Sequence, residues 1–197
     1  MIKRLFDLFF ALIGFTLLLP LFLFLLTWIL IDDPKNSPFY RQIRVGKNGR
    51  EFGLFKFRSM RPNADQAGKL TVGTADSRVT KVGKVLRKYK LDELPQFLNI
   101  LNGDMSFVGP RPEVPDFVDL YTAEQRKVLS VRPGLTDFAS LKYINENELL
   151  ARAENPKQYY IDVIMPDKIK LGIEYVQKQS VFTDLSIIFR TLTRIVR

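Results

Sequence analysis

The segment from residue 8 to residue 31 contains no charged side chain, and it limits the folds open to this chain more than any other feature. A run of about 20 apolar residues is long enough to cross the hydrocarbon core of a bilayer as a helix. Lys3 and Arg4 would also suit the start of a secretory signal peptide, but Asp7 interrupts that start and no small-residue cleavage pattern ends the run. The sequence therefore predicts a membrane-embedded helix over residues 1–33.

Pro20, near the middle of the run, decides how this helix can sit in the membrane. Proline removes a backbone donor and bends or breaks a helix. Each half of the run would measure only about 16–18 Å at 1.5 Å per residue, too short for a hydrocarbon core of roughly 30 Å. A re-entrant helix fits this break, and so does a spanning helix with a tolerated kink, because proline is frequent in such helices. The residues alone leave both arrangements open.

Basic residues flank the run on both sides. Lys3 and Arg4 precede it, and the residues that follow it include Lys35, Arg41, Arg44 and Lys47. The positive-inside tendency would place both flanks in the cytoplasm, which favours the re-entrant arrangement over a spanning anchor with an extracytoplasmic domain. The net charge of +9 also indicates an anionic partner, either nucleic acid, a phospholipid surface or a phosphorylated substrate.

The chain contains neither cysteine nor histidine. This excludes disulfides, thiolate nucleophiles, zinc sites of the usual kind and any mechanism that needs an imidazole base. A catalyst built from this sequence would depend on carboxylates, Lys, Arg, Tyr or Ser. Mg²⁺ would suit such a site, because its ligands are carboxylates, phosphates and water.

Residues 34–197 are predicted to form one compact domain of the α+β class, mostly helical with a small β-hairpin. Apolar and polar residues alternate over 39–46 and 50–58, and Lys47-Asn48-Gly49 between them favours a hairpin turn. Residues 61–77 are polar and predict a loop. Helices are expected over 81–90, over 94–101 before Gly103, after a capping box at Thr122 and Gln125, over 146–154, over 156–174 and over 185–197.

The last of these helices is amphipathic. One stripe holds Leu185, Ile188, Phe189, Leu192 and Ile195, and another holds Arg190, Arg194 and Arg197. Such a basic amphipathic helix can lie in a membrane interface. Packing of its apolar stripe on the domain core is the commoner alternative. The preceding membrane helix favours the interface.

Asp92 and Glu93 stand where one predicted helix ends and the next begins, with Pro95 in the first turn of the second. In isolation, Asp92 is explained as a helix N-cap. However, several basic residues occupy turn-flanked or helix-terminal segments, where they could converge on one site; they are Lys56, Arg58, Arg87, Arg111 and Arg132. Such cations bind phosphate, and a carboxylate can attack phosphorus only where cations offset the negative charges. One acidic residue could then attack while the other holds a metal.

Three segments together resemble a known family. They are KFRSM at 56–60, LDELPQ at 91–96 and GDMSFVGPRPE at 103–113. This combination is similar to that of the bacterial sugar transferases, the monotopic polyprenyl-phosphate phosphoglycosyl transferases, and the likeness covers nearly the whole chain. The resemblance implies a re-entrant helix in the bacterial inner membrane and a catalytic domain that faces the cytoplasm.

The resemblance also implies a Mg²⁺-dependent reaction in two steps. Asp92 would attack the β-phosphorus of a UDP-sugar so that UMP leaves, and polyprenyl (undecaprenyl) phosphate would then take the phosphosugar from Asp92. Glu93, with Asp92 beside it, would bind the metal. The residues expected to bind substrate are Lys56, Arg58, Arg87, Gln96, Asn99, Arg111 and Arg132. The partners would include membrane phospholipid and no nucleic acid, and the reaction would begin the membrane stage of glycoconjugate or polysaccharide assembly.

Two positions depart from the family pattern. Leu19 stands before Pro20 where the family often has serine, and Asp-Phe-Ala-Ser at 137–140 replaces a Gly-Trp-Ala-Gln run. The second departure leaves the identity of the sugar open. An alternative function is a membrane-tethered binding protein that holds anionic lipid or nucleic acid without catalysis. It explains the charge but not the acidic pair.

Overall fold

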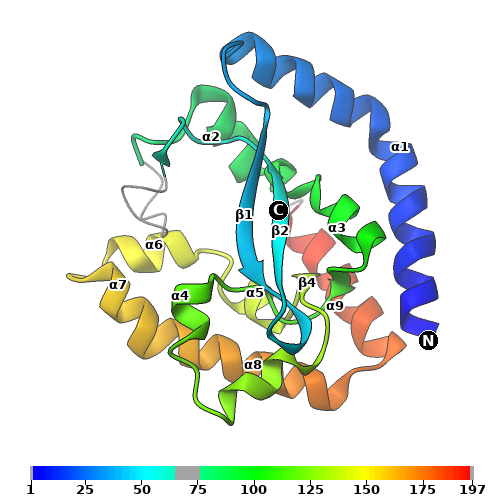
Figure 1. The fold of residues 1–197 in the computed structure, drawn as a ribbon, viewed down its shortest axis with the longest axis vertical. Coiled ribbons are helices and arrows are strands. Elements are labelled where there is room, and N and C mark those ends of the chain that lie inside the picture. Colours follow the sequence, from blue (N-terminus) through cyan, green and yellow to red (C-terminus); the bar gives the residue numbers. More distant parts are fainter. Residues whose placement is uncertain (1, 65–75, 196–197) are drawn as a thin grey trace.

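A computed structural model of the protein describes residues 2–64 and 76–195. Within these ranges helices predominate and the strands form two small sheets, which agrees with the predicted class (Figure 1). Residues 65–75 of the predicted loop over 61–77 lie outside the described residues.

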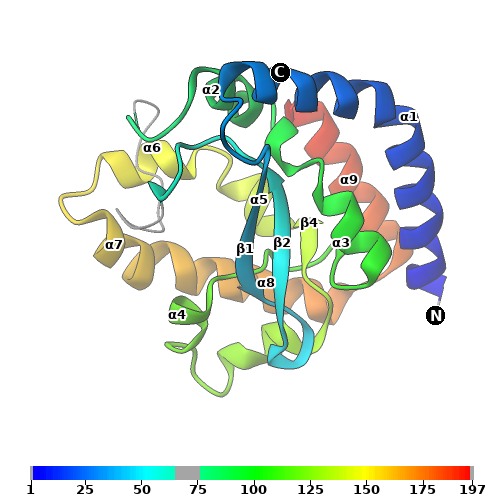
Figure 2. The same ribbon diagram turned by 45° about the horizontal axis from the view of Figure 1, so that its top comes forward.

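The first helix, α1, runs from Ile2 to Asp32 and contains Pro20. Figures 1 and 2 show that it follows one side of the domain and then turns over the top of it. Most of its apolar side chains are exposed. Among the described residues it is the one helix long and apolar enough to cross a membrane, judged by length and composition.

The first half of α1 is held against the domain by polar contacts. Arg4 donates hydrogen bonds to the carbonyl oxygens of Ile100 at 2.6 Å and Leu101 at 3.0 Å. Asp7 is buried and accepts hydrogen bonds from the Ser106 hydroxyl at 2.9 Å and the Phe107 amide at 3.1 Å. A buried carboxylate is stable only where it is hydrogen-bonded, so this part of α1 has a fixed place on the domain.

The second half of α1 is held mainly by apolar packing. Leu25 and Ile29 are buried in one cluster with Phe57, Val82 and Leu86 of the domain. Burial of such side chains is worth about 1.5–3 kcal/mol each. Both halves of the helix therefore contact one and the same domain.

The predicted hairpin is confirmed. Strands β1 (Phe39–Val45) and β2 (Glu51–Phe57) pair antiparallel. The turn over 47–49 places Asn48 at φ 58° and Gly49 at φ 76°, and these two residue types adopt the left-handed region most readily.

The next segment positions the acidic pair. Helix α2 (Lys81–Lys88) is followed by a single 3₁₀ turn (Leu91–Glu93), and α3 (Gln96–Asn102) comes after Pro95. The predicted N-cap role of Asp92 is wrong, because α3 begins four residues later and Asp92 lies inside the 3₁₀ turn. Lys90, the residue before that turn, adopts the left-handed region at φ 57°.

The predicted end of α3 and the predicted capping box are both confirmed. Gly103 ends α3 at φ 92°, and its amide donates to carbonyl oxygens of the last turn. The Thr122 amide donates to the Gln125 side chain at 2.9 Å, and the Gln125 amide donates to the Thr122 hydroxyl at 3.2 Å. This box opens a 3₁₀ helix over Gln125–Ser130.

The second sheet pairs β3 (Ser106–Val108) in parallel with β4 (Gly134–Thr136). The other elements are α4 (Pro115–Val118), α5 (Phe138–Lys142), α6 (Glu146–Ala151), α7 (Pro156–Tyr159), a π-helical turn (Tyr160–Ile164), α8 (Met165–Lys178) and α9 (Val181–Ile195). The predicted helices over 146–154 and 156–174 correspond to α6 and to the run from α7 through α8.

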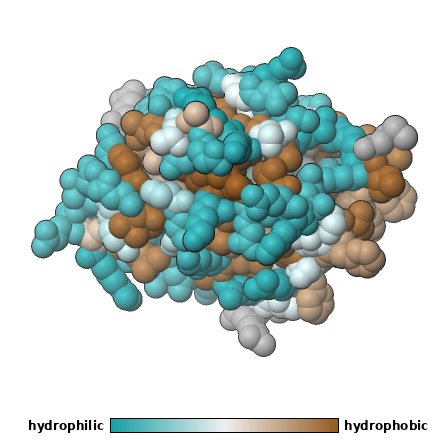
Figure 3. Space-filling model, turned by 90° about the horizontal axis from the view of Figure 1, so that it is seen from below, coloured by the Kyte–Doolittle hydropathy of each residue, from teal (hydrophilic) through white to brown (hydrophobic). Residues whose placement is uncertain are grey.

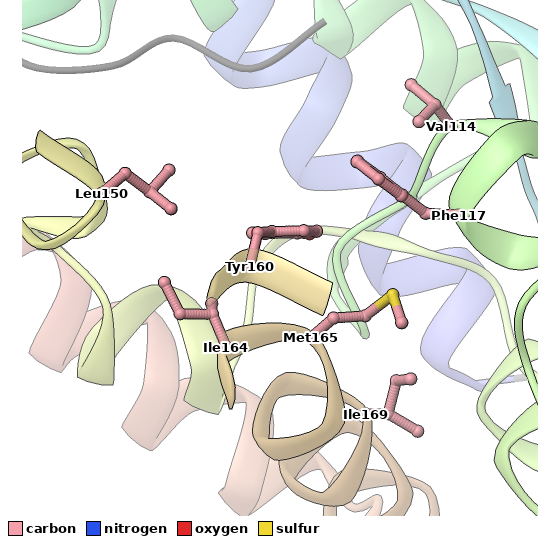
Figure 4. Packing of buried hydrophobic residues seen from close by; sticks show 7 residues of the cluster. All are labelled: Val114, Phe117, Leu150, Tyr160, Ile164, Met165 and Ile169. Carbon is pink, nitrogen blue, oxygen red and sulfur yellow. The ribbon is translucent and has the colours of Figure 1, made fainter. Parts of the chain in front are cut away.

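One apolar cluster joins α4, α6 and the start of α8. Figure 4 shows its seven buried members, Val114, Phe117, Leu150, Tyr160, Ile164, Met165 and Ile169. The rings of Phe117 and Tyr160 lie 4.9 Å apart between centroids. Because this cluster fixes the chain directly after Glu113, it also fixes the loop that carries Arg111.

Of the predicted apolar stripe on α9, Ile188 packs partly against the core, whereas Leu185, Phe189 and Leu192 are exposed. Ile187, outside that stripe, is fully buried. A place for this helix in the membrane interface stays a prediction. The Ile195 side chain and Arg197, also assigned to the predicted stripes, lie outside the described residues. Figure 3, seen from below, shows a mostly hydrophilic surface with hydrophobic atoms between the polar ones, and further hydrophobic atoms along the right-hand side, where Figure 1 places the start of α1.

Candidate active site

A cavity of about 730 Å³ lies against the 3₁₀ turn that carries the acidic pair. This volume is in the range of sites that bind small molecules. Five residues singled out from the sequence line it together, namely Lys56 of β2, Arg87 of α2, Asp92 and Glu93 of the 3₁₀ turn, and Arg111 after β3. Residues that are 55 positions apart in the chain therefore meet at one wall.

Glu93 is fixed by two cations. Arg111 Nη2 lies 2.5 Å from Glu93 Oε1, and Lys56 Nζ lies 3.8 Å from the same oxygen. Burial alone would raise the pKa of Glu93, but the charges of Arg111 and Lys56 and the hydrogen bond from Arg111 outweigh it and lower the pKa to about 2. Glu93 is thus a permanent anion at neutral pH.

Asp92 differs from its neighbour in its surroundings. Only 5% of the residue is exposed, and burial raises its pKa, with Glu93 adding to the rise and Lys56 and Arg87 opposing it. Adjacent carboxylates whose environments push their pKa values apart can take different roles. Here one carboxylate is held in an ion pair and the other is the more basic.

Lys56 and Arg111 have pKa values moved in opposite directions. Burial lowers the pKa of Lys56 to about 8, although Glu93 and Asp92 favour its charged form. The charge of Glu93 raises the pKa of Arg111 above its ordinary value. Lys56 therefore titrates within the range in which enzymes work, whereas Arg111 keeps its charge throughout.

Asp137, one of the departures from the family pattern, supports Arg111. One carboxylate oxygen of Asp137 accepts a hydrogen bond from the backbone amide of Arg111 at 3.1 Å. The other caps α5 by accepting from the amide of Ser140 at 2.6 Å. Arg87, which also lines the cavity, donates from Nε to the Ser59 hydroxyl at 2.9 Å. Both arginines thus have fixed positions.

Four other predicted substrate-binding residues do not line this cavity. Arg58 pairs with Asp33 beyond the end of α1, and Arg132 donates to the Gly103 carbonyl at 2.7 Å. Asn99 is fully buried and links α3 to β2, because it accepts from the Phe55 amide at 2.9 Å and donates to the Gly53 carbonyl at 2.8 Å. Their hydrogen bonds are used within the fold.

Gln96 is the fourth of these residues. It is 1% exposed and does not line the cavity either, although only Leu94 and Pro95 separate it from the 3₁₀ turn along the chain. Its amide nitrogen has no hydrogen-bond partner among the described residues.

The cavity residues that the sequence did not single out include a linked polar group of Arg44, Glu113 and Tyr160. Arg44 Nη1 lies 3.2 Å from Glu113 Oε1, and the Tyr160 hydroxyl donates to the other oxygen of Glu113. Burial is the largest cause of the raised pKa of Tyr160, and the negative charge of Glu113 adds to the rise. Glu113 ends the third family segment, which could have marked it, but nothing in the sequence connects it with residues 44 and 160.

The site offers oxygen ligands for a divalent cation. Asp92 and Glu93 stand side by side at the cavity wall, and Mg²⁺ in proteins is commonly held by one or two carboxylates together with substrate phosphates and water. The described residues contain no group of three or more acidic side chains that could form a complete protein cage. The pair therefore fits a metal that substrate phosphates help to bind.

The sequence is similar to those of known proteins over nearly its whole length. A sequence model of the bacterial sugar transferase family matches residues 1–197. A relative from Aeromonas hydrophila, a UDP-N-acetylgalactosamine-undecaprenyl-phosphate N-acetylgalactosaminephosphotransferase by name, is 38% identical over 98% of this chain and 43% of its own length. A UDP-glucose:undecaprenyl-phosphate glucose-1-phosphate transferase from Caulobacter vibrioides is 34% identical over 96% of this chain and 68% of its own.

Relatives of similar length also occur. An uncharacterized sugar transferase of Bacillus subtilis is 36% identical over 98% of this chain and 87% of its own length. The chain thus spans less than half of the Aeromonas relative but most of the Bacillus one. The two relatives with named reactions share undecaprenyl phosphate as a partner and differ in the sugar. Similarity at this level therefore does not identify the sugar.

Proposed function

The chain belongs to the bacterial sugar transferase family, and we propose that it moves a sugar 1-phosphate from a UDP-sugar to polyprenyl (undecaprenyl) phosphate with release of UMP. The observation that carries this proposal is the acidic pair in the wall of a cavity whose cations include Lys56, Arg87 and Arg111. The names of the relatives supply the acceptor and the class of donor. Polysaccharide or glycoconjugate assembly at the inner membrane is the proposed setting.

Asp92 is the proposed nucleophile. In the first step one of its carboxylate oxygens bonds to the β-phosphorus of the UDP-sugar, and the bond from that phosphorus to the bridging oxygen breaks, so UMP leaves with the electron pair. In the second step a phosphate oxygen of the lipid attacks the same phosphorus, and Asp92 leaves as a free carboxylate. Burial, which raises the pKa of Asp92, supports this role because a more basic carboxylate is a better nucleophile.

The cations of the wall offset the charge of the reacting phosphates. Arg111 presents a planar fork suited to phosphate, and Lys56 and Arg87 add positive charge beside Asp92. Groups fixed in place before the reaction stabilise developing charge at little cost of reorganisation. Glu93 holds Arg111 and Lys56 in position through the ion pairs described above.

Mg²⁺ is the proposed cofactor, and Glu93 and Asp92 are the residues that would hold it. When bound with the diphosphate, it would neutralise negative charge and favour departure of UMP. Glu93, whose pKa lies near 2, is ionised and ready to bind a cation at every working pH.

Lys56 gives the proposed reaction a pH dependence. With a pKa of about 8, its ammonium is charged below that pH and neutral above it. We expect kcat/KM for the UDP-sugar to fall as the pH rises through about 8, because kcat/KM reports groups of the free enzyme. In Lys56→Arg the alkaline limb, which is this fall in kcat/KM, should shift to higher pH, because a guanidinium stays charged. An alkaline limb at the same pH in both proteins would show that another group titrates.

The contacts of α1 support a re-entrant arrangement. At its start Lys3 pairs with Asp184, and just past its end Asp33 pairs with Arg58. A helix that crossed the bilayer would separate its two ends by the membrane thickness of roughly 30 Å and could not keep both on one domain. We therefore place both ends of α1 and the catalytic domain on the cytoplasmic side.

Thiol labelling tests this topology, because the chain has no cysteine of its own. Ile2→Cys and Lys35→Cys place single thiols at exposed positions on either side of the apolar run. Both should react with a membrane-impermeant maleimide only when the cytoplasmic face is accessible. Reaction of the two thiols from opposite faces would establish a spanning helix.

Release of UMP tests the reaction itself. The purified protein is supplied with Mg²⁺, polyprenyl phosphate and one member at a time of a panel of UDP-sugars. We expect UMP and a lipid-linked sugar phosphate from at least one donor. Retention of anionic lipid with no UMP from any donor would favour the alternative of a tethered binding protein.

A further inference from the structure

The wall of the cavity has an apolar part that the reaction at Asp92 leaves unexplained. One side comes from the first half of α1, with Phe6, Phe10, Gly14 and Leu18, and the other comes from α9, with Leu185, Ile188 and Leu192. Spacings of three and four residues place each set on one face of its helix. An apolar face of each helix thus lines the same cavity as the acidic pair.

Two aromatic rings lie at the base of this region. Phe97 of α3 and Phe107 of β3 both line the cavity, and their ring centroids are 5.5 Å apart. Gly14 admits the first ring, because a Cβ at that position would come within 2.7 Å of Phe97 Cε1. The two helices and these rings define an apolar groove, named here the α1–α9 groove.

Polar contacts fix the two helices relative to each other at one end of the groove. Lys3 of α1 pairs with the buried Asp184 of α9, and the Tyr175 hydroxyl donates to Asp184 at 2.7 Å. The apolar side chains themselves are only partly covered, since Phe10, Leu185 and Leu192 are 45%, 47% and 58% exposed. Apolar side chains that stay exposed beside a charged site commonly mark a binding surface.

We propose that the α1–α9 groove binds the hydrocarbon chain of the polyprenyl phosphate acceptor and directs its phosphate to Asp92. This inference rests on the proposed function. A prenyl phosphate has an anionic head and a long apolar chain, and this single cavity offers cations on one part of its wall and the groove on another. The groove lies along the apolar helix α1, so a chain that remains largely in the bilayer can reach it.

Matched substitutions on α9 test the groove. Leu185→Asn and Leu192→Asn remove apolar surface from the groove, whereas Phe189→Asn removes it from a neighbouring position that does not line the cavity and is 69% exposed. In detergent micelles we expect the first two variants to raise KM for polyprenyl phosphate about tenfold, because each loses one apolar side chain that the bound hydrocarbon chain would cover. Phe189→Asn should leave this KM unchanged, and KM for the UDP-sugar should stay the same in all three.

Two results would overturn the groove assignment while the reaction stands. They are an unchanged acceptor KM in Leu185→Asn and Leu192→Asn, and an equal rise in Phe189→Asn, which would indicate a general effect of α9 on membrane contact. UMP release from the UDP-sugar without acceptor isolates the first step and should be the same in every variant. No UMP from the unsubstituted protein would instead reject the proposed function, and the groove assignment with it.

Discussion

Asp92→Asn is expected to lower the rate of UMP release by on the order of 10³-fold or more, because it removes the proposed nucleophile while keeping the shape of the side chain. The same change should not lower the melting temperature. Burial raises the pKa of Asp92, so its charged form opposes folding at neutral pH, and a neutral amide removes that cost. Loss of activity in a protein of equal or greater stability would be the signature of a functional residue.

Two measurements complete this test. Mass spectrometry of the intact protein after incubation with the UDP-sugar should show an added phosphosugar in the unsubstituted protein and none in Asp92→Asn. Asp119→Asn, at an exposed position outside the cavity, is the matched control and should retain full activity. Full activity in Asp92→Asn would reject the nucleophile assignment.

Arg111→Met is expected to damage both stability and activity. The Glu93 side chain is only 12% exposed, and this substitution leaves its carboxylate with one ion-pair partner among the described residues, Lys56 at 3.8 Å. Loss of one partner of a fully buried pair costs roughly 3–5 kcal/mol. We expect about 2 kcal/mol here, because 32% of the Arg111 side chain is exposed. Loss of its charge at the phosphates should reduce kcat/KM about 100-fold.

The double variant Arg111→Met with Glu93→Gln separates these two effects. The neutral amide no longer needs a cation, so much of the lost stability should return, and the two substitutions should be non-additive in denaturant unfolding. Activity should not return, because the phosphate ligand and the proposed metal ligand are both absent. Additive stability losses would show that the pair contributes little to the fold, and recovery of activity would exclude both from the site.

Local patterns were sufficient for the elements whose geometry depends on neighbouring residues. Alternating side chains around Asn48 and Gly49 predicted the hairpin, and Gly103 predicted the end of α3. The prediction that Asp92 caps α3 failed, because the place of Asp92 depends on the backbone conformation of Lys90. Lys90 adopts the left-handed region, for which lysine has no special preference. Tertiary packing, which sequence patterns do not encode, holds that conformation.

The site was predicted only in part for a related reason. Lys56 and Arg58 are two residues apart and would share one face of a strand, but β2 ends at Phe57, so Arg58 turns away to Asp33. Lys56 remains in the cavity. The pairing of Glu113 with residues 44 and 160 brings together three distant segments, and one sequence contains no signal for it.

The packing of α1 has a consequence for how this protein can be divided. Leu25 and Ile29 belong to the same buried cluster as Val82 and Leu86, and Ala11 belongs to another with Ile100. A self-sufficient folding unit has its own apolar core, and residues 34–197 lack part of theirs without the helix. The predicted boundary near residue 33 therefore does not separate two folding units, and under the proposed re-entrant arrangement insertion of α1 into the membrane and completion of the domain would be one assembly event.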